Sequence, residues 1–358
     1  MALSIGIVGL PNVGKSTLFN ALTDANALAA NYPFATIEPN TGIVPIPDDR
    51  LNKLAEIYKT DKIVPATVTF VDIAGLVEGA SQGEGLGNQF LSHIRSTNAI
   101  CQVVRAFEEG DVQKAGATDP RHDIEIINTE LILADLQTVN NRLPRLEKEI
   151  KADPKLKPLM DVYIKLKNGL EEGKLAGSFL DEEERGQIQD LQLLSAKPFL
   201  FVFNLGEGQL ADDKLKAKLS SIVTPAPSVF VSAKLESELR GLDEIDRQEL
   251  LESYGQSESG LVQLIHAAYA ALGLQSYLTA GEQEVRAWTI PAGATAPQAA
   301  GVIHSDFERG FIAASVVKYQ DLIAAGNEAA ARAAGKIRTE GKTYVMQPDD
   351  VVEFKFNV

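Results

Sequence analysis

The sequence has almost no cysteine, no long apolar run and no excess of basic charge. Cys101 is the only cysteine among 358 residues, which excludes an intrachain disulfide and a cysteine-cluster zinc site. No stretch approaches the ~18 to 20 apolar residues that a membrane-spanning helix needs. The first residues, MALSIGIVGLPNVGKST, lack the basic region of a signal peptide. These absences predict a cytoplasmic protein.

The net charge is strongly acidic but unevenly distributed. It is −15 for the chain, whereas residues 142–168 carry +4 and residues 169–190 carry −5. The overall excess of acid argues against a protein that binds RNA over its whole surface. The basic segment 142–168 and the acidic segment 169–190 have two interpretations. They form a helical hairpin whose limbs attract each other, or the basic segment is an edge that contacts RNA. Residues 277–358 carry only −2, so an RNA contact there also stays open.

Short apolar runs rich in β-branched residues alternate with segments of helical length. Runs of this kind are typical of strands buried on both faces of a parallel sheet, linked by helices. The sequence therefore predicts an α/β fold with a mostly parallel sheet. The expected strands are residues 3–8, 67–71, 100–107, 199–203 and 229–231.

Two further segments stand apart from this alternation. Residues 123–197 separate the third and fourth strands, and a connection of this length is too long for a loop. The spacing of its apolar residues predicts a helical arm, followed by a lysine-rich stretch punctuated by Pro144, Pro154 and Pro158. From residue 277 onward, short β-like pieces and glycine turns predict a separate small α+β domain. We therefore expect domains at residues 1–276 and 277–358.

The first expected strand runs directly into GLPNVGKST, residues 9–17. This is the pattern G-x-x-x-x-G-K-[ST] between a strand and a helix, which is typical of a phosphate-binding loop, or P-loop. Gly9 and Gly14 let the backbone wrap around phosphates, Lys15 reaches the β- and γ-phosphates, and the Ser16 hydroxyl is placed for Mg²⁺. The predicted nucleotide-binding residues of this loop are Asn12, Val13, Gly14, Lys15, Ser16 and Thr17.

Two segments downstream complete the expected phosphate site. The strand in TFVDIAGL ends in Asp-x-x-Gly, so we expect Asp72 to hold Mg²⁺ through a water and the Gly75 N–H to meet the γ-phosphate. Between the motifs, NYPFATIEPN carries Thr36, the type of residue that ligates Mg²⁺ as a switch segment orders. Thr41 is the competing candidate.

The strand at residues 199–203 leads into Asn204-Leu205-Gly206-Glu207, where GTPases of this fold show Asn-Lys-x-Asp. The aspartate of that motif accepts two hydrogen bonds from guanine, and adenine would leave it partly unpaired. Here Leu205 and Glu207 replace the lysine and the aspartate, which weakens guanine selection and permits adenine. An asparagine such as Asn204 can still pair with adenine. The next strand ends in Ser232, Ala233 and Lys234, which match the loop that completes a base pocket.

These motifs, GLPNVGKST, NYPFATIEPN, DIAGLV, NLGE and SAK, together with VRAWTIPAGATAPQAAGVIHSDFERGF, resemble those of the YchF-type Obg-like ATPases. This is the Obg branch of the translation-factor-class P-loop NTPases, and the resemblance covers nearly the whole chain. It implies a P-loop nucleotide-binding domain with a coiled-coil helical insertion, and a C-terminal β-grasp domain of the TGS type. It also implies slow hydrolysis of ATP in preference to GTP, with Mg²⁺ as cofactor. The ribosome is the implied partner, in a nucleotide-dependent switch on translation or the stress response.

The group that positions the attacking water is not identified by these motifs. Leu76 stands where many GTPases have a glutamine, and Lys114 stands where members of the family often carry a histidine. We therefore expect Lys15 and the Gly75 backbone to stabilise the transition state, while His93 and His122 are surface or packing residues. Two alternatives to an ATPase stay open, a GTPase of the Obg class and a nucleotide-gated scaffold with incidental turnover. Nothing in the sequence suggests an obligate interface, so we expect a monomer.

Overall fold

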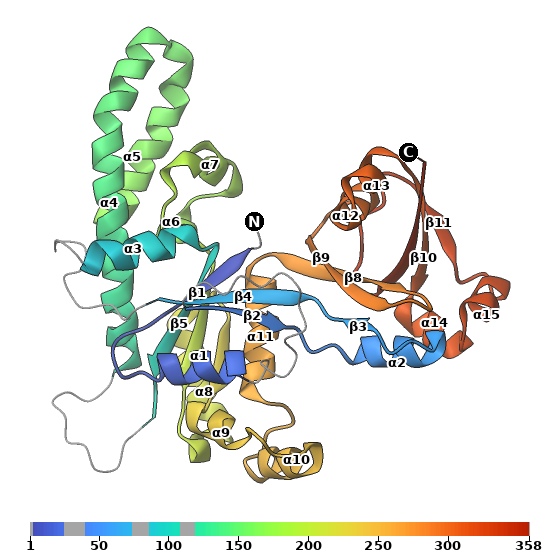
Figure 1. Cartoon of the computed structure of the whole chain (residues 1–358). Helices are drawn as coiled ribbons and strands as arrows, with labels where there is room; N and C mark the ends of the chain where they lie inside the picture. Colours follow the sequence, from blue (N-terminus) through green and yellow to red (C-terminus); the bar gives the residue numbers. More distant parts are fainter. Residues whose placement is uncertain (1–2, 25–39, 74–85, 108–118, 358) are drawn as a thin grey trace. The chain divides into compact units, whose positions relative to one another are not determined.

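The computed structural model describes residues 3–24, 40–73, 86–107 and 119–357 (Figure 1). Thr36, Gly75, Leu76 and Lys114 lie outside these residues. The described chain forms two compact units, the first from residues 1–42 and 69–272 and the second from residues 43–68 and 273–358. The second unit therefore contains a segment from the middle of the expected first domain, which the sequence did not indicate.

A six-stranded sheet in the order β2-β4-β1-β5-β6-β7 forms the core of the first unit, and parts of β2 and β4 lie in residues 43–68. The pairs β1–β4, β1–β5, β5–β6 and β6–β7 are parallel, so the predicted mostly parallel sheet is confirmed. The sequence did not predict the edge strand β2. The strands are β1 (Ser4–Val8), β2 (Thr41–Pro45), β4 (Thr67–Asp72), β5 (Ala99–Arg105), β6 (Phe199–Asn204) and β7 (Ser228–Val231).

Helices of the first unit connect and cover these strands. Their apolar faces supply the buried clusters that pack against the sheet, for example Leu219 and Val223 with Phe201 and Phe203. The helices are α1 (Lys15–Asp24), α3 (Leu86–Ser96), α4 (Pro120–Ala152), α5 (Lys157–Glu171), α6 (Ala176–Phe179), α7 (Glu182–Gln187), α8 (Asp213–Val223), α9 (Ala233–Glu238), α10 (Glu244–Ser253) and α11 (Gly260–Ala271).

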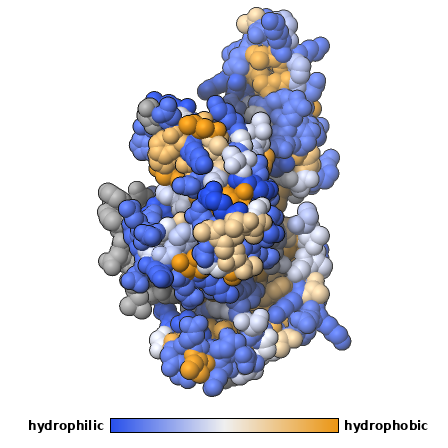
Figure 2. Space-filling model, turned by 90° about the vertical axis from the view of Figure 1, so that its right-hand side faces the viewer, coloured by the Kyte–Doolittle hydropathy of each residue, from blue (hydrophilic) through white to orange (hydrophobic). Residues whose placement is uncertain are grey.

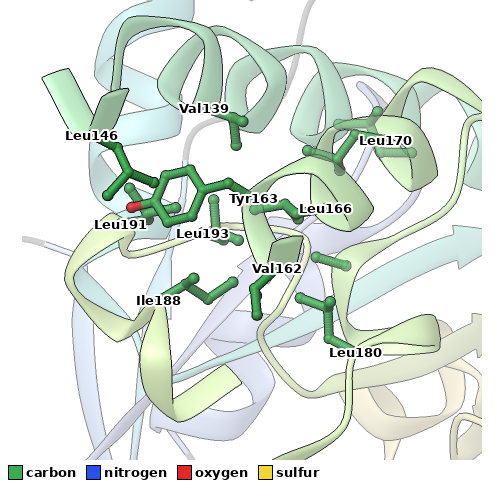
Figure 3. Packing of buried hydrophobic residues seen from close by; sticks show 12 residues of the cluster. Val139, Leu146, Val162, Tyr163, Leu166, Leu170, Leu180, Ile188, Leu191 and Leu193 are labelled. Atoms are coloured by element: carbon green, nitrogen blue, oxygen red, sulfur yellow. The ribbon is translucent and has the colours of Figure 1, made fainter. Parts of the chain in front are cut away.

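The predicted helical insertion is a hairpin of α4 and α5, joined by a short 3₁₀ turn at Pro154–Leu156. The two helices lie side by side and project from the sheet (Figure 1). Figure 3 shows their apolar core, in which Val139 and Leu146 of α4 face Tyr163 and Leu166 of α5. Pro144 lies inside α4 and does not end it. Proline costs ~3 kcal/mol in a helix, and burial of the flanking apolar side chains offsets that cost.

The second unit has a six-stranded sheet in the order β11-β10-β12-β8-β9-β3. The hairpin β8–β9 is antiparallel, whereas β12 returns parallel to β8, as in a β-grasp fold. Tyr277 of β8 is fully buried and donates a 2.9 Å hydrogen bond to the Ala299 carbonyl, which fixes helix α12 to the sheet. The strands are β3 (Ile63–Val64), β8 (Leu274–Ala280), β9 (Val285–Pro291), β10 (Phe311–Lys318), β11 (Arg338–Glu340) and β12 (Asp350–Phe356). The helices are α2 (Asp49–Tyr58), α12 (Ala296–Ile303), α13 (Ser305–Arg309), α14 (Tyr319–Ala325) and α15 (Glu328–Ala333).

The surface in Figure 2 is mostly hydrophilic, with separate apolar areas. Within the described ranges, no helix has the length and apolarity to span a bilayer. Cys101 is fully buried in β5, and burial raises the pKa of its thiol to about 12.

Candidate nucleotide-binding site

The P-loop motif lies between the end of β1 and the start of α1. Asn12 and Gly14 have φ angles of 64° and 92°, so both adopt the left-handed backbone conformation. A Cβ atom on Gly14 would lie 2.3 Å from the Asn204 Nδ2 atom, so only glycine fits at that position. The unpaired N–H groups of the first turn of α1 make this end of the helix a binding site for anions. The loop therefore has the backbone geometry that phosphate binding requires.

Lys15 and Asp72 meet at this loop. The parallel pairing of β1 with β4 places Asp72 opposite Ile7, next to the start of the P-loop. The Lys15 Nζ donates a 3.1 Å hydrogen bond to the Asp72 Oδ1, and the two side chains are only 10% and 18% exposed. Ser16 and Thr17 follow in the first turn of α1 and are exposed. A cation, a carboxylate and two hydroxyls are thus gathered at one end of α1.

Asn204 ties the P-loop to the loop after β7. Its side chain is 4% exposed. Its Nδ2 donates to the Val13 carbonyl at 2.9 Å, and its Oδ1 accepts from the Ala233 N–H at 3.0 Å. One N–H and one acceptor lone pair of the amide stay available to a base. Asn204 therefore positions two loops through its side-chain hydrogen bonds, and the sequence did not indicate this role.

A pocket of about 640 Å³ opens beside the P-loop at the ends of β6 and β7. It brings together all six predicted base-pocket residues, although they come from segments far apart in the sequence. Its lining consists of Asn12, Gly14, Thr17, Phe107, Asn204, Leu205, Gly206, Glu207, Ser232, Ala233, Lys234 and Ser237. Volumes of ~300–1,000 Å³ are usual for pockets that hold small molecules.

Glu207 and Lys234 form an ion pair at the pocket. The Lys234 Nζ donates to the Glu207 Oε2 at 3.0 Å, and this hydrogen bond raises the pKa of Lys234. The second carboxylate oxygen, Oε1, is buried and has no hydrogen-bond partner among the described atoms. Leu205 differs from both, because its side chain belongs to a buried apolar cluster and is 2% exposed. Ser232 caps α9 through the Leu235 N–H.

Phe107 is a pocket residue that sequence reasoning missed. It follows β5, and the Arg105 guanidinium carbon lies 4.5 Å from the centroid of its ring. An aromatic ring in such a pocket offers a face on which a base can stack. The available signal was an aromatic residue directly after a buried parallel strand, at the same sheet edge as the P-loop.

The histidines of the described residues lie outside this pocket. His93 and His122 are exposed on α3 and at the start of α4. His304 caps α13 by accepting a hydrogen bond from the Asp306 N–H. Among the residues that the structure describes, no three His, Cys, Asp or Glu side chains gather as a metal site would require.

Comparison with known proteins places the chain in a family. Residues 4–152 match the family model "50S ribosome-binding GTPase", and residues 274–357 match YchF-GTPase_C, described as "Protein of unknown function (DUF933)". The chain is 52% identical to "Ribosome-binding ATPase YchF" of Bacillus subtilis and 50% identical to the protein of that name from Haemophilus influenzae, in both cases over the full length of both chains. The structure of the Schizosaccharomyces pombe YchF GTPase matches with a TM-score of 0.87 and 40% identity, over 99% of this chain and 97% of that one. The chain therefore belongs to the YchF family of Obg-like P-loop NTPases.

Proposed function

We propose that this protein is a ribosome-associated, Mg²⁺-dependent ATPase that acts as a nucleotide-dependent switch. The observation that carries the proposal is the P-loop, with the Lys15–Asp72 pair at the start of α1 and a base pocket beside it. The names of its relatives support ATP as the nucleotide and the ribosome as the partner. Such an enzyme works in the cytoplasm, and we propose that it does so as a monomer.

The residues present fit Mg²⁺. Ser16 offers an exposed hydroxyl in the first turn of α1, and the residue before it, Lys15, pairs with the partly exposed Asp72 carboxylate. Mg²⁺ prefers one or two protein oxygens together with waters and phosphate, which agrees with the small number of ligands here. Ser16 and Thr36 would hold the ion directly and Asp72 would hold it through a water. When bound, the ion neutralises charge on the β- and γ-phosphates.

The protein groups stabilise the charge that develops on the γ-phosphoryl group. With nucleotide bound, Lys15 donates its hydrogen bonds to phosphate oxygens and no longer to the Asp72 carboxylate. The first-turn N–H groups of α1 hold the phosphates in place. The Gly75 N–H would meet the γ-phosphate. Donors fixed before the reaction need no reorganisation in the transition state, which is the main source of rate enhancement in phosphoryl transfer. The proposal assigns no residue to position the attacking water.

The Glu207–Lys234 pair and Leu205 support a preference for adenine. A buried apolar Leu205 cannot replace the lysine of the GTPase motif, and one oxygen of Glu207 is held by Lys234. Isothermal titration of the full chain with non-hydrolysable ATP and GTP analogues in Mg²⁺ tests this preference. We expect tighter binding of the ATP analogue. Tighter binding of the GTP analogue would make the protein a GTPase of the Obg class.

The variant Lys15→Ala tests whether turnover is required, with calorimetry measuring how much affinity for the ATP analogue it keeps. We expect this variant to lose hydrolysis, because the cation that neutralises the γ-phosphate is removed. The variant is then compared with the wild-type chain in ribosome co-sedimentation and in complementation of a strain that lacks the protein. If a variant that binds ATP without hydrolysing it kept full function, the protein would be a nucleotide-gated scaffold.

The helical arm is the proposed RNA contact. Lys148, Lys151 and Lys155 are exposed near its tip, and no ion pair holds them within the described chain. The basic segment 142–168 is also attracted to the acidic segment 169–190, since Lys165 of α5 pairs with Glu184 of α7. Changing the three lysines to glutamate should weaken ribosome binding and reduce its salt dependence, because each phosphate contact releases about one counterion. Unchanged binding would leave only the hairpin role for these charges.

A further inference from the structure

The second unit contains a pocket of its own, with a volume of about 390 Å³. It is bounded by the turn between β8 and β9, by β12, by the end of α12 and by α13 (Figure 1). It shares no residue with the nucleotide-binding pocket. A volume in this range can hold a small molecule or a large side chain. Nothing in the proposed function uses this pocket.

Aromatic rings form the apolar part of its lining. Trp288 of β9, Phe307 of α13 and Phe354 of β12 are partly buried side chains that pack against the core of this unit and also line the pocket. The Phe307 ring stacks on Phe356 at a centroid distance of 3.7 Å, and Phe356 is 39% exposed. The aromatic surface therefore continues outward from the pocket. Aromatic rings left open in this way are typical anchors of a binding surface.

The charged part of the lining is acidic. Glu282, Glu284 and Glu353 line the pocket, and no lysine or arginine of the described residues does so. Glu284 is already paired, with Lys62 at 2.7 Å and with Arg286 at 3.1 Å. Glu282 and Glu353 are exposed and form no ion pair within the described part of the chain. Two carboxylates are therefore available to a cation that enters the pocket.

The same unit shows which cation suits such a lining. The Arg286 guanidinium carbon lies 4.6 Å from the centroid of the Trp288 ring, and the Arg286 Nε lies 3.1 Å from the Glu284 Oε1. A guanidinium is planar and weakly hydrated, so it can stack on an aromatic ring and pair with a carboxylate at the same time. The pocket offers these two elements again, as two phenylalanine rings and two unpaired carboxylates.

We propose that this pocket binds an arginine side chain carried by a basic segment of a partner protein. The phenylalanine rings stack on the guanidinium, and the carboxylates of Glu282 and Glu353 accept its hydrogen bonds. The same carboxylates repel phosphate groups, so the charge of the lining disfavours an RNA strand. The site goes beyond the proposed function, because it requires neither a nucleotide nor the P-loop.

Tryptophan fluorescence tests this proposal, because Trp288 is the only tryptophan of the chain and lines the pocket. The full chain is titrated with an oligo-arginine peptide capped at both ends. An oligo-glutamate peptide of the same length and oligouridine are the comparison ligands. We expect oligo-arginine to change the Trp288 emission in a saturable way, with an affinity that falls as salt is added. The two comparison ligands should leave the emission unchanged.

Matched variants separate the pocket from the acidity of the chain as a whole. Glu282→Gln combined with Glu353→Gln should weaken oligo-arginine binding at least about threefold, because two ion pairs with the peptide are lost. Glu328→Gln combined with Glu340→Gln removes two carboxylates of the same unit that do not line the pocket, and this variant should bind as the wild type does. Phe307→Leu keeps an apolar side chain without the ring and should weaken binding at least about twofold.

Four results would overturn the proposal. They are an unchanged Trp288 emission in millimolar oligo-arginine, an equal affinity of the two double variants, an unchanged affinity of Phe307→Leu, and tighter binding of oligouridine than of oligo-arginine. Equal affinities would mean diffuse attraction to an acidic protein, and preference for oligouridine would assign the pocket to RNA. Calorimetry with the ATP analogue on the same variants tests the proposed function separately, and we expect that affinity to be unchanged.

Discussion

Replacing Asn204 with alanine should loosen two loops at once. The substitution removes the donor to the Val13 carbonyl and the acceptor of the Ala233 N–H, and both residues are buried. Each unpaired buried backbone group costs ~1–3 kcal/mol. We therefore expect the junction between the P-loop and the loop after β7 to lose about 2–6 kcal/mol of local stability.

Hydrogen exchange at the Ala233 amide measures this loss directly. A factor of ten corresponds to 1.4 kcal/mol, so exchange should be faster by about 30- to 20,000-fold. Binding of an ATP analogue should weaken in parallel, because the Val13 carbonyl belongs to the P-loop. Asn204→Asp is the informative comparison, since it keeps an acceptor for Ala233 and loses the donor to Val13. If Asn204→Ala kept both the amide protection and the affinity, the bridging role assigned to this side chain would be wrong.

Four further changes follow from the described contacts. Gly14→Ala should lower ATP-analogue affinity at least tenfold in calorimetry, because its Cβ would lie 2.3 Å from the Asn204 side chain and its φ is 92°. Gly208→Ala is the control and should keep the affinity, because a Cβ on Gly208 would have no atom within 4 Å. Lys234→Ala should leave the urea midpoint unchanged, since its side chain is 71% exposed, while altering nucleotide affinity at the pocket. Burial raises the pKa of Asp135 in the folded protein, so the protonated carboxyl group stabilises the fold. This contribution to the free energy of unfolding is fully present below the unfolded pKa of about 3.9 and is lost as pH rises through the folded pKa. Asp135→Asn should therefore lack this decline in urea titrations as the pH rises above about 4. Tyr277→Phe should destabilise the second unit by ~1–2 kcal/mol in urea, because the Ala299 carbonyl loses its donor.

The candidate site could be located from the sequence because its signals are local. A P-loop needs glycines, a lysine and a hydroxyl at fixed spacing between a strand and a helix, and all of these are adjacent in residues 9–17. The parallel strands were predictable because their buried, β-branched runs are continuous. The arm was predictable from its length, although Pro144 was not expected inside a helix. Packing of α4 against α5 outweighs the local preference of that residue.

The sequence by itself determined the fold class, the P-loop and the departure of Leu205 and Glu207 from the GTPase motif. Only the tertiary structure showed that Asn204 bridges two loops, that Phe107 lines the pocket, and that residues 43–68 belong to the second unit. It also joined α4 to the segment before β6, through hydrogen bonds of Asp135 with the Leu194 and Ser195 N–H groups. The physical reason is the sequence distance over which each feature arises. Backbone geometry and hydrophobic periodicity depend on neighbouring residues, whereas buried hydrogen bonds and pockets form between segments that only folding brings together.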